Sequence, residues 1–101
     1  EGFGAYSAMK GAIEVLTKYM AKEGGKRGIR VNVVAPGAIA TDFGGGSVRD
    51  NQQIKEHIAS NIALGRVGEA DDIGGVVASL CTDEFGCVNG TRLEVSGGQM
   101  L

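Results

Sequence analysis

The fold class follows from one short stretch of the chain, Ile29-Arg30-Val31-Asn32-Val33-Val34-Ala35-Pro36-Gly37. Its β-branched residues are nearly continuous instead of alternating with polar ones, which is typical of a parallel strand that is covered on both faces. Proline cannot donate to a sheet ladder, so Pro36 and Gly37 end the run. We therefore predict a strand over residues 29–35 within an α/β sheet.

A long amphipathic helix is predicted before this strand, over residues 5–23. Apolar side chains recur three and four positions apart and form two neighbouring stripes. One stripe contains Tyr6, Met9, Ile13, Leu16 and Met20, and the other contains Ala5, Ala8, Ala12, Val15 and Tyr19. Because one core needs only one stripe, we expect the helix to be covered on two sides, by its own sheet and by another helix. Gly24 and Gly25 are predicted to end it as a left-handed cap.

Similar patterns predict helices over residues 50–62 and 70–81, and the turn Asn89-Gly90 introduces a short strand over residues 91–95. This order of elements is that of half an open α/β sheet. We therefore expect residues 1–101 to form one α/β unit, the C-terminal half of a Rossmann-like doubly wound parallel sheet with two strands and about three helices. Since two strands cannot shield both faces of a sheet from water, the missing strands must come from elsewhere. Either the chain is a piece of a longer protein or it assembles with copies of itself, and oligomerisation is expected to complete the sheet.

The composition excludes several functional classes. The 101 residues carry 10 basic and 12 acidic side chains, with a net charge of -2 and no dense run of one sign. We therefore expect no nucleic-acid or membrane partner. The N-terminal residues 1–4 lack the features of a signal peptide, so a cytoplasmic protein is expected. With 18 glycines and 5% aromatic residues, the core is expected to be thin and aliphatic.

Cysteine usage indicates neither a disulfide nor a metal site. The two cysteines, Cys81 and Cys87, are expected to be buried, inert thiols, and one distant histidine does not complete a zinc site with them. That histidine, His57, is expected on a polar helix face. Asp71 and Asp72 are interpreted as residues that favour a helix N-terminus, so no metal is predicted.

Candidate chemistry is concentrated in the stretch Tyr6-Ser7-Ala8-Met9-Lys10. A tyrosine and a lysine four positions apart lie side by side on a helix, where the ammonium stabilises a phenolate and makes the phenol a usable general acid or base. Taken alone, the pair has a second interpretation, as an amphipathic tyrosine at the edge of the core beside a solvated lysine. The rest of the sequence is needed to choose between them.

Further segments follow this pair in a characteristic order. They are Arg30-Val31-Asn32 running to Pro36-Gly37, then Ala38-Ile39-Ala40-Thr41-Asp42, then Gly65-Arg66-Val67-Gly68-Glu69, and finally Asn89-Gly90-Thr91 leading to Val95-Ser96-Gly97-Gly98. Together with the Tyr-x-x-x-Lys helix, this set resembles the C-terminal half of the short-chain dehydrogenase/reductase family. The resemblance covers nearly the whole chain.

The resemblance implies a role for each matching residue. Tyr6 would exchange a proton with the substrate oxygen while a hydride passes between substrate and nicotinamide, and Lys10 would bind the nicotinamide ribose and activate Tyr6. The segment Pro36-Gly37-Ala38-Ile39 would border the nicotinamide, with the Ile39 backbone at its carboxamide, and Thr41 would place a hydroxyl nearby. Ligands of open α/β sheets bind beyond the carboxyl ends of strands, which agrees with this placement. NAD or NADP is the implied cofactor.

The family's dinucleotide-binding motif has no counterpart in these residues. No glycine-rich turn, no cofactor-selecting residue and no catalytic serine can be placed ahead of Tyr6, and Gly44-Gly45-Gly46 is interpreted as a mobile substrate-covering segment. The chain is therefore expected to be a segment of an NAD(P)-dependent oxidoreductase without activity of its own. The alternative is a self-assembling, non-enzymatic remnant. In both cases we expect a homodimer or homotetramer that pairs through helix 5–23 and strand 91–95.

Overall fold

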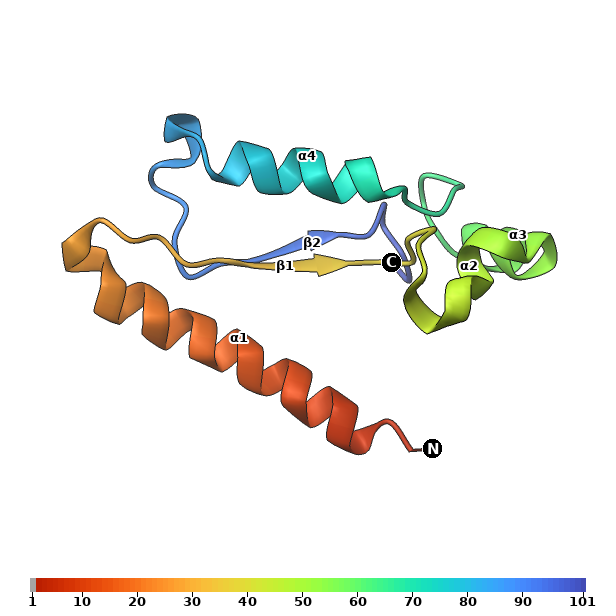
Figure 1. Ribbon diagram of the computed structural model, residues 1–101, viewed down its shortest axis with the longest axis horizontal. Helices are drawn as coiled ribbons and strands as arrows, with labels where there is room; N and C mark the ends of the chain where they lie inside the picture. Colours follow the sequence, from red (N-terminus) through yellow and green to blue (C-terminus); the bar gives the residue numbers. More distant parts are fainter. Residues whose placement is uncertain (1) are drawn as a thin grey trace. The chain divides into compact units, whose positions relative to one another are not determined.

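The computed structural model describes residues 2–101 and divides the chain into two compact units. Unit 1 consists of Glu1–Val34 and Thr82–Leu93, and unit 2 consists of Ala35–Cys81 and Glu94–Leu101. Figure 1 shows the order of the helices and strands along the chain. The chain passes from one unit to the other within each of its two strands and once between them.

The two strands, β1 (Val33–Pro36) and β2 (Arg92–Val95), pair in a two-stranded sheet. The Val33 N–H donates to the Thr91 carbonyl at 2.9 Å, and the Gly37 N–H donates to the Val95 carbonyl at 3.1 Å. Because the acceptor advances along the chain together with the donor, the strands are parallel. The predicted α/β class with a parallel sheet is confirmed.

β1 begins later than predicted, at Val33 instead of Ile29. The backbone before it bonds to a turn and not to a neighbouring strand. The Val31 N–H donates to Asn89 Oδ1 at 2.8 Å, and the Val31 carbonyl accepts the Gly90 N–H at 2.8 Å. Both backbone groups of Val31 are therefore used by that turn, and the regular ladder begins only at Val33.

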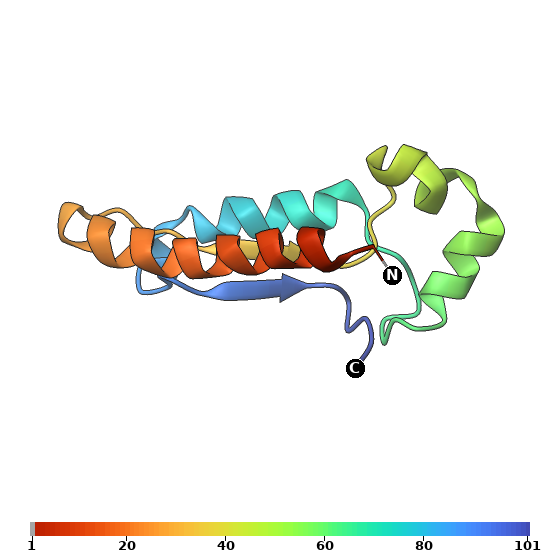
Figure 2. The ribbon, with the colours of Figure 1, turned by 90° about the horizontal axis from the view of Figure 1, so that it is seen from below.

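Unit 1 contains helix α1 (Gly4–Gly24), which agrees with the prediction for residues 5–23 and runs without interruption (Figure 2). The predicted left-handed cap at its end was wrong. Gly25 has a right-handed backbone, with φ -57°, and begins the 3-10 turn η1 (Gly25–Arg27). The left-handed residue is Gly28, with φ 72°. The helix is thus followed by one 3-10 turn, and Gly28 ends this turn because glycine adopts a positive φ without steric strain.

The buried side of α1 is neither of the two predicted apolar stripes. It is a third line of small residues, Thr17, Ala21 and Gly24. Small side chains let the chain before β2 approach the helix, and the Asn89 side chain donates to the Ala21 carbonyl at 3.3 Å. The large side chains of α1 that remain exposed are Tyr6, Met9, Ile13, Val15, Leu16, Tyr19 and Met20. The prediction that the helix's own sheet covers one stripe was therefore wrong.

Unit 2 contains η2 (Phe43–Gly46), α2 (Ser47–Asp50), α3 (Gln52–Ala59) and α4 (Ala70–Leu80). The predicted helix over residues 50–62 is interrupted at Asn51, whose Oδ1 accepts the Ile54 N–H at 3.1 Å. This contact is an N-cap, so a polar residue within the periodic pattern begins α3 instead of continuing a longer helix. The helix also ends before Ile62, because Ile62 forms an antiparallel bridge with Gln99.

The N-terminus of α4 is held by a network around Asp72, which lies in the first turn as predicted. Arg66 donates to both carboxylate oxygens of Asp72, at 2.7 and 3.0 Å, and the Glu69 N–H donates to Asp72 Oδ2 at 2.8 Å. The hydrogen bonds from Arg66, followed by that from the Glu69 backbone, lower the pKa of Asp72 to about 2. The ionised form of Asp72 is therefore favoured in the folded chain.

We expect Asp72→Asn to make stability less sensitive to acid. Because the pKa of Asp72 is lowered from 3.8 to about 2 on folding, its contribution is complete above pH 4 or so and is lost as the pH falls through about 2. Denaturant unfolding of the chain across this window should show a shallower acid decline for the variant. Equal slopes for wild type and Asp72→Asn would refute this.

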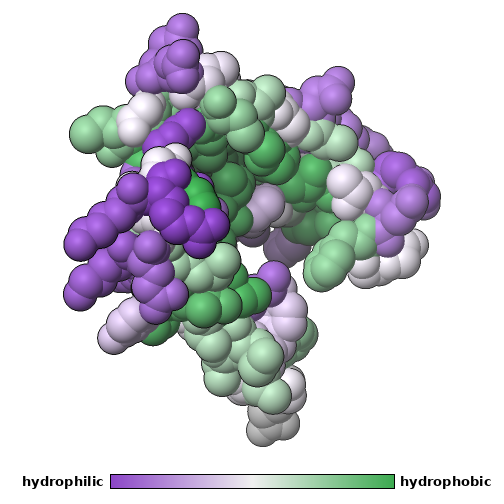
Figure 3. Space-filling model, turned by 60° about the vertical axis from the view of Figure 1, so that its left-hand side comes forward, coloured by the Kyte–Doolittle hydropathy of each residue, from purple (hydrophilic) through white to green (hydrophobic). Residues whose placement is uncertain are grey.

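Each unit has a small aliphatic core, in agreement with the composition. The buried hydrophobic residue of unit 1 is Ala21, and those of unit 2 are Ile62 and Val67. Many larger apolar side chains lie at the surface, and Figure 3 shows them as green areas beside the purple hydrophilic residues. Covering exposed apolar side chains with another surface removes them from water and lowers the free energy.

Candidate active site

Tyr6 and Lys10 lie on one face of α1, in unit 1. The Lys10 Nζ atom lies over the Tyr6 ring, 5.3 Å from the ring centroid. Phe3 packs edge-on against the same ring, with the two centroids 6.4 Å apart. Tyr6 is nevertheless 52% exposed. A phenol that can donate a proton is thus placed beside a cation and remains open to solvent.

The predicted nicotinamide segment, Pro36–Ile39, leaves the carboxyl end of β1 in unit 2. The backbone of its central residue, Ala38, is held on both sides. The Ala38 N–H donates to Gln99 Oε1 at 2.8 Å, and the Ala38 carbonyl accepts the Gly68 N–H at 2.9 Å. The backbone that leads into Ile39 is therefore fixed by two different parts of the chain.

Ile39 presents a backbone donor at this end of the strand. It forms a parallel bridge with Gly68, but the hydrogen bonds of that bridge use the peptides on either side of Ile39. Within residues 2–101, the Ile39 N–H has no hydrogen-bond acceptor. Thr41 lies next to it, with its N–H bonded to the Ile39 carbonyl at 2.9 Å and its Oγ1 accepting the Phe43 N–H at 3.3 Å. The Thr41 hydroxyl can still donate its own proton.

The six predicted site residues fall into two groups. Tyr6 and Lys10 belong to unit 1, whereas Pro36, Gly37, Ile39 and Thr41 belong to unit 2. Within each group the residues are close neighbours. The roles predicted for the two groups stay predictions.

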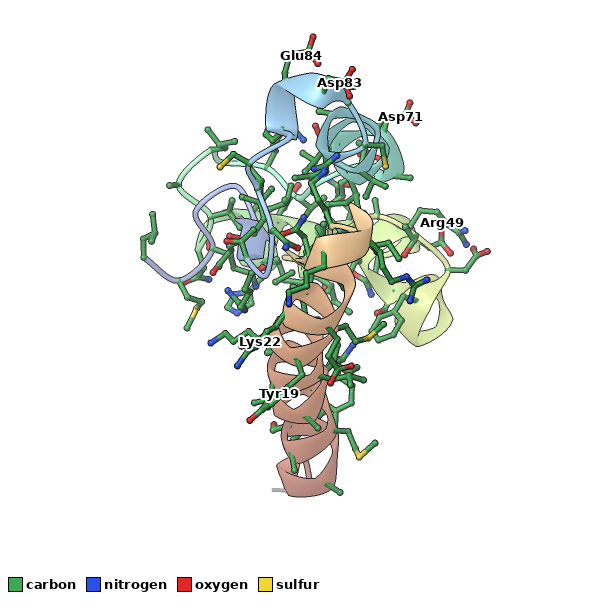
Figure 4. All side chains as sticks on the ribbon, turned by 90° about the vertical axis from the view of Figure 1, so that its left-hand side faces the viewer. Tyr19, Lys22, Arg49, Asp71, Asp83 and Glu84 are labelled. Atoms are coloured by element: carbon green, nitrogen blue, oxygen red, sulfur yellow. The ribbon has the colours of Figure 1, made fainter. Side chains whose placement is uncertain are left out.

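The glycine segment Gly44–Gly46 forms a self-contained turn. All three residues have positive φ, between 62° and 77°, which glycine adopts without steric strain. Arg49 closes the turn through ion pairs with Asp42 and Asp50, and Figure 4 shows its guanidinium at the surface. The hydrogen bond from Arg49 lowers the pKa of Asp50. This turn directly follows the predicted cofactor segment in the chain.

Both cysteines are exposed, so the prediction of buried thiols was wrong. Cys81 caps the end of α4, and Cys87 follows the 3-10 turn η3 (Asp83–Phe85); side chains at such turns point to solvent. His57 is exposed on α3, as predicted. Among residues 2–101, no group of three or more His, Cys, Asp or Glu side chains could hold a metal ion. None of the helices in the same range is long and apolar enough to cross a membrane.

Gln99 is the residue at this site that sequence reasoning missed. Its side chain bonds to Ala38, 61 positions earlier in the chain. Periodicity and spacing relate only residues that are near in sequence, so they do not reveal this contact. One signal was available, a polar side chain placed directly after Gly97-Gly98 and before two apolar residues.

Comparison with known proteins identifies relatives over nearly the whole chain. The family model described as Enoyl-(Acyl carrier protein) reductase matches residues 1–100. The 3-oxoacyl-[acyl-carrier-protein] reductase of Haemophilus influenzae is 48% identical over 96 residues, which make up 95% of this chain and 38% of that protein.

Solved structures share the fold as well. The promiscuous reductase LugOII, which catalyses keto-reduction at C1 during lugdunomycin biosynthesis, superposes with a TM-score of 0.87 and 44% identity, over 97% of this chain and 38% of its own. A 4-hydroxyisoleucine dehydrogenase mutant complexed with NADH and succinate has a TM-score of 0.83 and 37% identity, over 94% of this chain and 39% of its own. The chain thus spans 38–39% of the length of these relatives.

Proposed function

Because the chain belongs to the short-chain dehydrogenase/reductase family, we propose that it is the proton-transfer segment of an NAD(P)-dependent oxidoreductase that interconverts an alcohol and a carbonyl compound. The observation that carries this proposal is the contact of the Lys10 ammonium with the Tyr6 ring on an exposed face of α1. The 3-oxoacyl and keto reductases among the relatives favour a ketone as the oxidised substrate.

In the reduction direction, the Tyr6 hydroxyl gives its proton to the carbonyl oxygen and becomes a phenolate. The hydride for the new C–H bond at the carbonyl carbon would come from the reduced nicotinamide when it is bound. The Lys10 ammonium beside the ring stabilises the negative charge that Tyr6 develops, which lowers the free energy of the proton-transfer transition state. In the oxidation direction, the same phenolate accepts the proton of the alcohol.

The residues of unit 2 fit a nicotinamide carboxamide. A primary amide has an acceptor oxygen and a donor NH2 group. Ile39 offers a backbone N–H that has no acceptor within residues 2–101, and Thr41 offers a hydroxyl that both accepts and donates. These residues would hold the carboxamide at the carboxyl end of β1, and Lys10 would bind the ribose, as the family resemblance implies.

The test compares two proteins with acetoacetyl-CoA, a small 3-oxoacyl thioester. The 101-residue chain alone is expected to oxidise neither NADH nor NADPH, because it contains no glycine-rich pyrophosphate turn. A hybrid protein, made by joining residues 1–101 to the N-terminal region of the Haemophilus influenzae reductase that the chain does not match, is expected to turn over with one of them. Cofactor absorbance reports the rate. A hybrid that circular dichroism shows to be folded but that has no turnover would contradict the proposal and favour a non-enzymatic assembly.

We also propose that a second copy of the chain covers the exposed apolar side of α1. The large apolar side chains of α1 are 46–67% exposed, and burying them against another surface would lower the free energy. A two-fold axis would place this surface against itself, and β2 would lie beside its own copy in the same way. Analytical ultracentrifugation should find a dimer or tetramer at micromolar concentration. Leu16→Glu should dissociate it, whereas Lys18→Glu on the polar side should not; a monomeric wild type would disprove the proposal.

A further inference from the structure

We propose that Gln99 is a positioning residue for the nicotinamide segment, an inference that rests on the function proposed above. Its side-chain carbonyl holds the N–H of the Gly37–Ala38 peptide and thereby restrains the backbone that leads into the next peptide, whose Ile39 N–H would bind the cofactor carboxamide. Gln99 therefore acts on the cofactor through the backbone and not by direct contact.

The contact between Gln99 and the segment is close and specific. Gln99 Oε1 lies 2.8 Å from the Ala38 nitrogen in a partly buried position. Since a backbone N–H can only donate, the partner atom must be the amide oxygen. A Cβ atom placed on Gly37 would lie 2.7 Å from the same Oε1, so the Gln99 side chain lies directly against the Gly37 backbone. No residue with a side chain at position 37 would leave room for this contact.

The backbone around Gln99 is itself fixed. The Gly98 carbonyl accepts the Ala63 N–H at 3.1 Å, and the Met100 N–H donates to the Asn61 carbonyl at 3.1 Å. These bonds pair the chain on either side of Gln99 with the chain that follows α3. The side chain of Gln99 therefore extends from an anchored backbone, which lowers the entropy lost in forming its bond to Ala38.

The two bonds of Ala38 hold two successive peptides: the Gly37–Ala38 peptide through its N–H, and the Ala38–Ile39 peptide, which carries the Ile39 N–H, through its carbonyl. The Gly68 N–H holds the Ala38 carbonyl at 2.9 Å, and Gln99 holds the N–H. Without Gln99 Oε1, the N–H of the Gly37–Ala38 peptide loses its acceptor, and of these two restraints only the bond from Gly68 to the next peptide remains. The Ile39 N–H is then less well directed toward a carboxamide, so cofactor affinity should fall while the proton-transfer pair on α1 is unchanged.

The first test measures the contact in the 101-residue chain. Gln99→Met has a similar length but no acceptor for the Ala38 N–H, whereas Gln99→Glu keeps one. By NMR, hydrogen exchange of the Ala38 amide should be about tenfold faster in Gln99→Met, as expected for the loss of one hydrogen bond. It should stay near the wild-type rate in Gln99→Glu and in Gln53→Met, a matched change on an exposed position of α3. Unchanged Ala38 exchange in Gln99→Met would overturn the inference.

The second test measures the consequence in the hybrid protein. Gln99→Met should raise the KM for the dinucleotide about fivefold with little change in kcat, and Gln99→Glu should restore the KM. An active hybrid whose cofactor KM is the same in wild type and Gln99→Met would overturn the positioning role alone. An inactive wild-type hybrid would instead overturn the proposed function, and with it the cofactor role of Gln99, even where Ala38 exchange supports the contact.

Discussion

Replacing Tyr6 with Phe is expected to lower the kcat of the hybrid protein by about 10²- to 10⁴-fold, the range by which a positioned general acid accelerates a reaction. The substitution keeps the ring that contacts Lys10 and Phe3 and removes only the hydroxyl. The KM for the dinucleotide should change little, because the predicted carboxamide contacts come from unit 2. Steady-state kinetics with acetoacetyl-CoA would measure both constants.

The matched control is Tyr19→Phe, which removes a hydroxyl from an exposed tyrosine of the same helix. Figure 4 shows Tyr19 and Lys22 pointing to one side of α1, so another tyrosine lies near a lysine there without the predicted catalytic role. This variant should keep the wild-type kcat. If Tyr6→Phe turned over as fast as Tyr19→Phe, Tyr6 would not be the proton donor.

Gly37→Ala is expected to destabilise the chain by about 1–3 kcal/mol, the usual effect of forcing an extra methyl group into a packed site. The new Cβ would lie 2.7 Å from Gln99 Oε1 and 2.8 Å from the Ser96 Cα. The Gln99 side chain could move only by giving up its bond to Ala38, and Ser96 Cα is backbone. Urea unfolding of the 101-residue chain would measure the loss.

Gly74→Ala provides the comparison for this effect. Gly74 lies inside α4, and a Cβ placed there meets no atom within 4 Å. Alanine at this position should stabilise the chain by about 0.5–1 kcal/mol, because glycine is the poorer helix former. If Gly37→Ala lowers the free energy of unfolding and Gly74→Ala raises it, the close contacts at position 37, and not the replacement of glycine as such, cause the destabilisation. A Gly37→Ala chain as stable as wild type would contradict the packing described here.

The elements that the sequence predicts well are those whose determinants are local. The helices α1 and α4 agree with their periodic patterns, because helical spacing depends only on neighbouring residues. β1 starts four residues later than predicted. The backbone N–H and carbonyl of Val31 bond to the Asn89 side chain and the Gly90 N–H, which lie near the other end of the sequence. The pattern of residues around β1 does not reveal a hydrogen-bond partner that lies 58 positions away in the sequence.

In the candidate site, too, the sequence predicts the local contacts but not the distant ones. The contact of Lys10 with Tyr6 follows from four-residue spacing on a helix, so the sequence is sufficient to predict it. The resemblance also pointed to the segment from Pro36 to Thr41. The bond that restrains this segment could not be found, because Gln99 reaches Ala38 across 61 positions and the contact depends on how the chain after α3 is paired.

The sequence by itself determined the α/β class, the long helix that carries Tyr6 and Lys10, and the family, because helix periodicity and a motif read in order require no knowledge of distant contacts. Only the tertiary structure decided which side of α1 is buried, where β1 begins and which residue holds the Ala38 N–H. These features depend on contacts between residues that are far apart in the chain, such as the hydrogen bonds of Asn89 with Val31 and of Gln99 with Ala38. Each buried backbone group needs a hydrogen-bond partner, and the folded structure determines which distant group supplies it.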